Sequence, residues 1–124
     1  MAIEVRVEVP AAGEFVQVAR NVAAAAAARG GCSVDTLADL RLAVDEAATR
    51  LLQDFRGSSL VVDVQGSADG VNVSVAVRAD VDGWPSAGLE ATMSWQIISA
   101  LVIDARATIS DVGPSISFGC PIAA

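Results

Sequence analysis

Apolar residues recur at every second position over two neighbouring segments in the middle of the chain, and a turn sequence separates them. The turn is Ser67–Gly70, which reads Ser-Ala-Asp-Gly. A period of two predicts a pair of β-strands, each with one buried face, and the turn predicts that they form a hairpin. A sheet with one apolar face has to be covered by helices or by a second sheet. The apolar positions are Leu60, Val62, Val64, Val71, Val73, Val75 and Val77.

The rest of the chain supplies the covering helices and further strands. Ser33 is a suitable N-cap residue for the second helix. The helices are grouped and do not alternate with every strand, which favours an α+β fold over a doubly wound parallel sheet. We expect a two-layer α/β sandwich of residues 1–124, in which a mostly antiparallel mixed sheet packs on three helices. The further expected elements are a strand over 3–9 that stops at Pro10, helices over 13–29, 34–55 and 91–104, a loop over 80–89, and a hairpin of 105–111 and 115–122 that turns at 112–114.

The charge of the chain excludes some functions. Its net charge is −7, from 15 acidic residues and eight arginines, with no lysine and no histidine. Nucleic-acid binding needs clustered cations, so we expect no direct nucleic-acid contact, whereas a basic protein partner is compatible. Without histidine, and with Cys32 and Cys120 far apart, we expect no metal site and two free thiols. No apolar run reaches the ~20 residues of a membrane span, so a cytoplasmic protein is expected.

The helix over 34–55 carries three charges in an apolar context: Asp45, Glu46 and Arg50. At 100° per residue, Glu46 points almost directly away from the apolar stripe, and Arg50 lies one turn further along the same side. One interpretation is an i,i+4 ion pair between Glu46 and Arg50, worth about 0.2–0.5 kcal/mol. The other is a functional site. The stripe itself consists of Leu37, Leu40, Val44, Ala48, Leu51 and Phe55.

The segment Asp39–Arg50, DLRLAVDEAATR, resembles the N-box helix of RsbW/SpoIIAB-type anti-sigma factors, serine kinases of the GHKL (Bergerat) ATPase superfamily. The variant VDExxTR, together with the later Ser94-Trp95 and Ala100-Leu101, is most similar to mycobacterial-type RsbW (UsfX) regulators. The order of expected elements is similar to that fold over nearly the whole chain. The resemblance implies a Bergerat-type sandwich, with Glu46 at the position of the catalytic base.

The same resemblance assigns a nucleotide site whose residues are altered here. Arg50 stands where the family has a magnesium-binding asparagine, and a guanidinium cannot coordinate a cation. Arg50 would then either neutralise Glu46 or bind a phosphate directly. Asp80 or Asp82 with Gly83 stands for the adenine-binding box, which lacks its first glycine. Ser94 lies where the phosphate-binding box has lost both glycines.

The resemblance therefore implies a cytoplasmic regulator that sequesters an RNA polymerase sigma factor and is released by an anti-anti-sigma (STAS) protein, as a homodimer. The alternatives are an ATP-dependent serine kinase that phosphorylates its antagonist, with Glu46 as base, and a sensor of Mg²⁺-bound ATP or ADP without chemistry. No cofactor is assigned, and turnover is not expected. Arg20 on the first helix and Trp84 in the loop, expected to be exposed, are the candidate partner contacts, whereas Trp95 is expected in the core.

Overall fold

The structure, a computed structural model, describes residues 3–122, which form five strands and three α-helices. Short 3-10 turns, η1 (Gly13–Phe15) and η2 (Leu89–Ala91), precede the first and third helices. The first two and the last two residues of the expected domain 1–124 lie outside the described part. The elements in chain order are β1 (Glu4–Pro10), α1 (Val16–Arg29), α2 (Val34–Asp54), β2 (Ser59–Gly66), β3 (Gly70–Val77), α3 (Met93–Leu101), β4 (Ile103–Ile109) and β5 (Pro114–Pro121).

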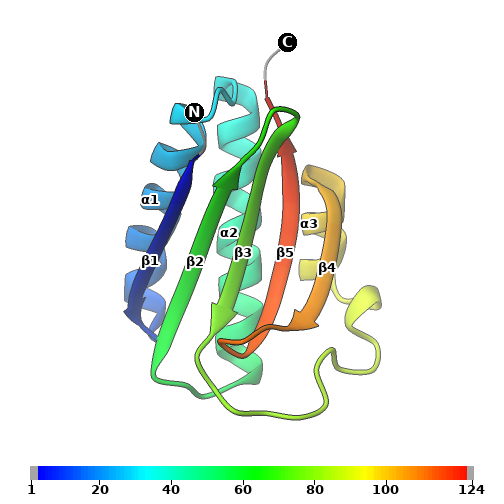
Figure 1. Cartoon of the computed structure of the whole chain (residues 1–124). Helices are drawn as coiled ribbons and strands as arrows, with labels where there is room; N and C mark the ends of the chain where they lie inside the picture. The colour runs from blue at the N-terminus through cyan, green and yellow to red at the C-terminus, as the bar shows by residue number, and fades with distance from the viewer. Residues whose placement is uncertain (1–2, 123–124) are drawn as a thin grey trace.

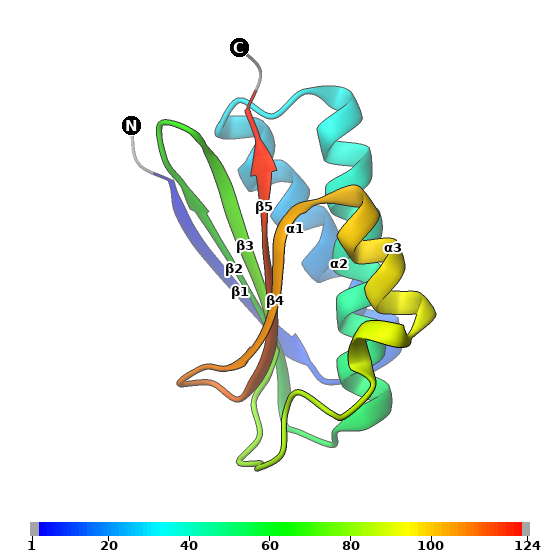
Figure 2. The same ribbon diagram turned by 90° about the vertical axis from the view of Figure 1, so that its right-hand side faces the viewer.

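The strands form one sheet in the order β1-β2-β3-β5-β4, and all three helices lie on the same face of it (Figures 1 and 2). This arrangement confirms the predicted α+β two-layer sandwich. Every strand pairing is antiparallel, so the prediction of a mixed sheet was wrong in that detail. The reason is that each connection between neighbouring strands is either a hairpin or returns the chain in the opposite direction. The sheet has two edges, β1 and β4.

The main core lies between the sheet and the helices, and the predicted alternation places it there. Leu60 pairs with Val77, and Val62 with Val75, so the apolar residues of the central hairpin share one face. Each such side chain contributes about 1.5–3 kcal/mol when fully buried. On the helix side, α1 buries alanines, which let its backbone approach the sheet closely. The alanines of α1 that are buried are Ala19, Ala23, Ala24, Ala26 and Ala27.

Helix α2 follows its prediction closely. The Ser33 hydroxyl accepts a hydrogen bond from the Thr36 N–H at 3.2 Å, which confirms the N-cap. The centre of the predicted apolar stripe, from Leu40 to Leu51, is fully buried, while Leu37 and Phe55 at its ends are half-buried. This helix lies in the middle of the helix layer, with α1 on one side and α3 on the other (Figure 2).

Helix α3 is shorter than the predicted 91–104. It begins after Thr92, whose hydroxyl oxygen accepts from the Trp95 N–H at 3.2 Å and donates to the Leu89 carbonyl at 2.6 Å. It ends at Leu101, because the β-branched Ile103 instead pairs with β5. Asp104 then adopts a φ of 54°, at a register irregularity that begins β4.

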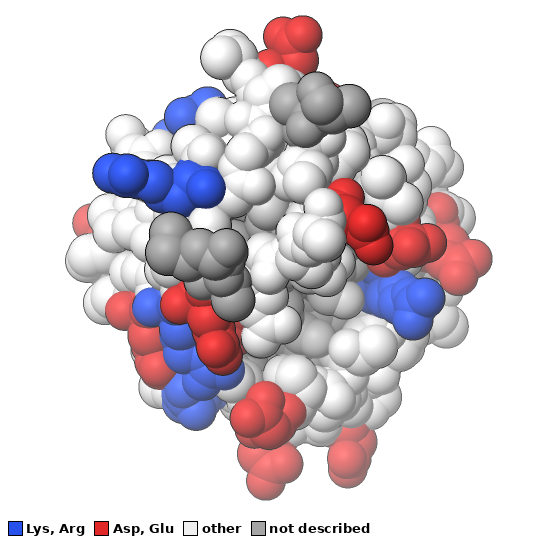
Figure 3. Space-filling model, turned by 45° about the horizontal axis from the view of Figure 1, so that its top comes forward, with Lys and Arg blue, Asp and Glu red and all other residues white. Residues whose placement is uncertain are grey.

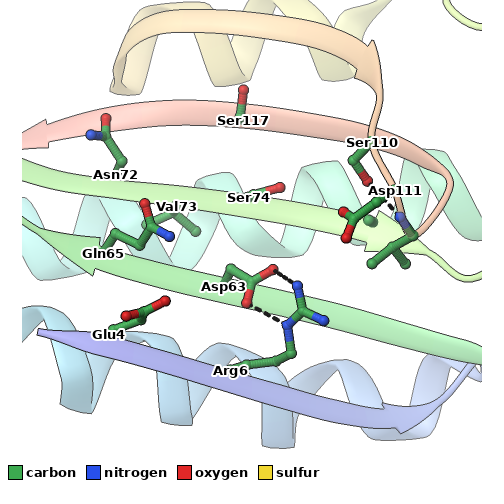
Figure 4. A pocket seen from close by; sticks show the side chains of 12 residues that line it. Glu4, Arg6, Asp63, Gln65, Asn72, Val73, Ser74, Ser110, Asp111 and Ser117 are labelled. Carbon is green, nitrogen blue, oxygen red and sulfur yellow. Dashed lines mark hydrogen bonds and ion pairs between the residues drawn. The ribbon is translucent and has the colours of Figure 1, made fainter.

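The other face of the sheet carries no helix, and it is polar. Arg6 on β1 and Asp63 on β2 form a two-bonded ion pair at 2.7 and 3.0 Å across this face (Figure 4). At one end the β4–β5 turn folds back, so that Val112 covers Val61 and Ala76 in a second, small apolar cluster. A shallow polar hollow of about 550 Å³ lies between this turn and the ion pair.

Candidate functional site

The arginine of the charged helix joins α2 to the first turn of α3. The Arg50 Nε donates to the Ser94 Oγ at 3.1 Å, and its Nη1 donates to the Asp54 carboxylate at 3.4 Å. Ser94 is buried, and the Arg50 side chain is about one-quarter exposed. Two of the predicted cofactor-binding residues are therefore brought together, and they bind each other.

The predicted ion pair between Glu46 and Arg50 was wrong. The Nε of Arg50 is directed at Ser94, and its Nη1 donates to Asp54, the acid one turn further along α2. In residues 3–122, Glu46 takes part in none of the four ion pairs or the side-chain hydrogen bonds. It is half-buried on the same side of α2 as Arg50.

Trp84, predicted to be exposed, is instead buried, with 5% of its surface exposed. Its indole N–H donates to the Ser115 carbonyl on β5 at 3.0 Å, which satisfies its one polar group. Its ring meets the ring of Phe55 edge-on, with the centroids 5.4 Å apart. The loop after β3 is therefore anchored between the end of α2 and β5. Trp95, expected in the core, is half-buried and packs against it.

The aspartates and the glycine that the resemblance assigns to the adenine-binding box lie on the outside of that loop. Asp80, Asp82 and Gly83 are exposed, and Gly83 has a φ of +82°. Asp80 lines a hollow of about 500 Å³ together with the β4–β5 turn, which includes Asp111. None of these three residues shares a hydrogen bond, an ion pair or a cavity with Arg50 or Ser94 in the described part of the chain.

Among the residues that the structure describes, five cavities stand out, and none of them is lined by Glu46, Arg50 or Ser94. Glu46, Arg50 and Ser94 thus line none of these cavities, whereas Asp80 lines the hollow beside the β4–β5 turn. In the same part of the chain, no group of three His, Cys, Asp or Glu side chains is placed to hold a metal ion.

The third charge of the helix, Asp45, pairs with Arg20 of α1. The Arg20 Nη1 donates to the Asp45 Oδ2 at 2.8 Å, and both side chains are about 70% buried, with exposed fractions of 27% and 30%. The Arg20 Nε and the Asp45 Oδ1 are buried without a hydrogen-bond partner. Both residues line two hollows, of about 470 and 510 Å³, in the groove between α1 and α2. We call this surface the α1–α2 groove.

The Arg20–Asp45 pair was missed by sequence reasoning, which considered Asp45 only beside Glu46. A signal was available, since Asp45 is about 100° around the helix from Glu46 and so faces a different neighbour. Arg20, predicted as an open partner contact, is thus already held by a carboxylate. It still lines the groove.

Glu8, Cys32 and Cys120 have shifted pKa values, and their side chains lie outside the candidate site. Hydrogen bonds from Arg78 and Ser59 hold the pKa of Glu8 at about 2, on the polar sheet face. Burial raises the pKa of Cys120 to about 12 and also raises the pKa of Cys32. Both cysteines are buried and free, as predicted.

The charged side chains on the end of the molecule shown in Figure 3 are dispersed. On this end, basic side chains lie in separate small groups among acidic and uncharged ones.

No family model and no curated protein matches the chain. Within the described residues, no helix is both long enough and apolar enough to cross a membrane.

Proposed function

We propose that the chain is a cytoplasmic anti-sigma-factor-like domain of Bergerat type, which acts by binding proteins and not by turning over a nucleotide. It sequesters an RNA polymerase sigma factor and is released when an anti-anti-sigma (STAS) protein competes for it. The resemblance of Asp39–Arg50 to the N-box helix supports the family. The strand and helix order of a two-layer sandwich is compatible with it.

The hydrogen bond between Arg50 and Ser94 is the observation that carries this proposal. It joins two positions that the resemblance assigns to the magnesium ion and to the phosphates. A guanidinium cannot coordinate a cation, and one tied to Ser94 and Asp54 has fewer N–H groups left for a phosphate. The bond also joins α3 to α2 at these two positions. The hydrogen bond between α2 and α3 therefore favours a role in binding a protein partner over a role in binding a nucleotide.

The α1–α2 groove is the surface that we assign to the partner. It is lined by Arg20, whose Nε has no hydrogen-bond partner, and by Leu42, which is 46% exposed. The net charge of −7 would attract a partner whose DNA-facing surface is basic, mainly by raising the association rate. The homodimer implied by the resemblance is part of the proposal and would present two such grooves.

The test is titration calorimetry of the purified protein with a sigma factor of the same cell, and separately with Mg-ATP and Mg-ADP. We expect micromolar or tighter binding of the sigma factor and no heat from either nucleotide. Arg20→Ala should weaken sigma binding at least tenfold, whereas Arg56→Ala, which removes an exposed arginine outside the groove, should leave it unchanged. Absence of sigma binding at micromolar concentration would overturn the proposal.

One observation favours the kinase alternative. Glu46 is not tied to Arg50, so its carboxylate is available to act as a base. This reading predicts that phosphate is transferred from ATP to the STAS protein and that Glu46→Gln abolishes the transfer. Arg50→Asn restores the residue that the family uses for magnesium, so it should raise nucleotide affinity if the rest of the site is retained. No transfer by either form at any Mg²⁺ concentration would eliminate this alternative.

A further inference from the structure

We propose that the edge strand β4 binds an extended segment of a partner protein, which adds to the sheet as a sixth strand. The segment would lie in a groove of about 580 Å³ between β4 and the loop Pro85–Ala91, which we call the β4 groove. This surface is separate from the α1–α2 groove, because the two share no lining residue. The inference goes beyond the proposed function and does not depend on which partner fills the α1–α2 groove.

The two edges of the sheet differ in how they are protected against pairing. The edge strand β1 carries Glu4, Arg6 and Glu8 and ends at Pro10. Two of these charges are held in ion pairs, Arg6 with Asp63 on β2 and Glu8 with Arg78 just after β3. Charges and proline on an edge discourage strand addition. The edge strand β4 has only Asp104 and Arg106 as charges and exposes two isoleucines by about half. These are Ile103, at 52%, and Ile109, at 50%.

The β4 groove follows the edge of the strand. It is lined by four consecutive residues, 105–108, and successive side chains of a strand point to opposite faces. A hollow that touches all four therefore lies beside the strand, where alternate backbone N–H and C=O groups point away from β5. Four residues of strand span about 13 Å, which is the length of a short added strand. Figure 1 shows the loop before α3 next to β4 on this outer side.

The lining residues indicate the chemistry of the segment. Ala105 and Ala107 are small, and Trp95 and Leu89 lie on the same groove, so large apolar side chains of the segment have room on the helix side. Arg106 is exposed on the opposite face and forms no ion pair within residues 3–122. A carboxylate directly across from it would form a cross-strand pair. Glu90, on the loop wall, is the one acidic residue of the lining. We infer a segment that alternates large apolar with acidic residues.

The experiment uses the whole isotope-labelled protein and a synthetic hexapeptide that alternates valine and glutamate, followed by amide NMR. We expect saturable shifts only at residues 103–109 and 85–91 and at Trp95, and at least tenfold slower hydrogen exchange at the outward amides of β4. Methylating alternate backbone nitrogens of the peptide keeps its side chains but removes N–H donors. This change should weaken binding at least tenfold.

A charge reversal supplies the matched control. Arg106→Glu should lower affinity for the valine–glutamate peptide and raise it for a valine–lysine peptide, each by about fivefold, whereas Arg56→Glu should change neither. Saturable shifts outside the β4 groove, no saturation by either peptide at millimolar concentration, or equal binding of the methylated peptide would overturn strand addition. The last result would instead describe a pocket that recognises side chains alone.

Discussion

At the scale of single residues, the Arg50–Ser94 hydrogen bond makes a prediction about stability. Ser94→Ala leaves a partly buried guanidinium N–H without its acceptor. A hydrogen bond to a charged group contributes about 1.5–3 kcal/mol, so we expect the free energy of unfolding to fall by about 1–2 kcal/mol, because one-quarter of the Arg50 side chain stays exposed. Ser99→Ala, on the exposed side of the same helix, is the matched control. Urea denaturation measures the free energy of unfolding of both variants. Equal losses in Ser94→Ala and Ser99→Ala would contradict the role given to Ser94.

The outcome at these residues shows which part of the site sequence reasoning could reach. The periodicity of α2 placed Glu46 and Arg50 on one side of the helix, as the structure has them. It did not show that Arg50 turns to Ser94, because that hydrogen bond depends on how α3 packs, 44 residues further along the chain. The burial of Trp84 depends likewise on a carbonyl of β5. Contacts between distant segments leave no periodic signal.

At the scale of elements, the β4–β5 turn depends on one glycine. Gly113 has a φ of +155°, and a Cβ there would meet the carbonyl oxygens of Val77 and Ala79, the latter at 2.7 Å. Backbone atoms cannot move aside as a flexible side chain can. Gly113→Ala should therefore cost about 3 kcal/mol or more in the free energy of unfolding.

The control for this turn is Gly83→Ala, because Gly83 also has a positive φ, +82°, but its Cβ would meet nothing within 4 Å. It should cost only the backbone strain, about 1–2 kcal/mol. Thermal denaturation compares the two variants. A loss at Gly113 no greater than that at Gly83 would mean that the turn can move away from the end of β3.

The elements themselves were predictable wherever one period extended over several residues. The alternating apolar residues of β2 and β3 form three cross-strand pairs, Leu60–Val77, Val62–Val75 and Val64–Val73, and the stripe of α2 extends over more than two turns. Both predictions were confirmed. The end of α3 at Leu101 was not predicted, because Ile98, Leu101 and Val102 suit a helix and a strand equally in the sequence. Pairing of Ile103 with Gly119 on β5 decides it. That all pairings are antiparallel likewise follows from the connections and not from any single segment.

At the scale of the whole molecule, the polar sheet face links stability to pH. Arg78, just after β3, donates two hydrogen bonds to Glu8 on β1, at 2.8 and 2.9 Å, and so connects two strands that β2 separates. These bonds, together with a hydrogen bond from Ser59, lower the pKa of Glu8 from 4.5 to about 2 in the folded protein. A carboxyl whose folded pKa is depressed stabilises the fold above its unfolded pKa, and this contribution is lost as pH falls through the folded value.

Stability should therefore decline between pH 4.5 and pH 2, and part of that decline belongs to this pair. Arg78→Gln removes the main cause of the depressed pKa, so it should lower stability at pH 7 and flatten the pH dependence below 4.5. Arg106→Gln changes the net charge equally but breaks no ion pair within residues 3–122, so its pH profile should remain parallel to that of the unchanged protein. Urea midpoints measured across this pH range compare the stability profiles of the Arg78→Gln and Arg106→Gln variants. If the two profiles coincide, general repulsion among the acids accounts for the acid sensitivity, and the cross-strand pair contributes nothing specific to it.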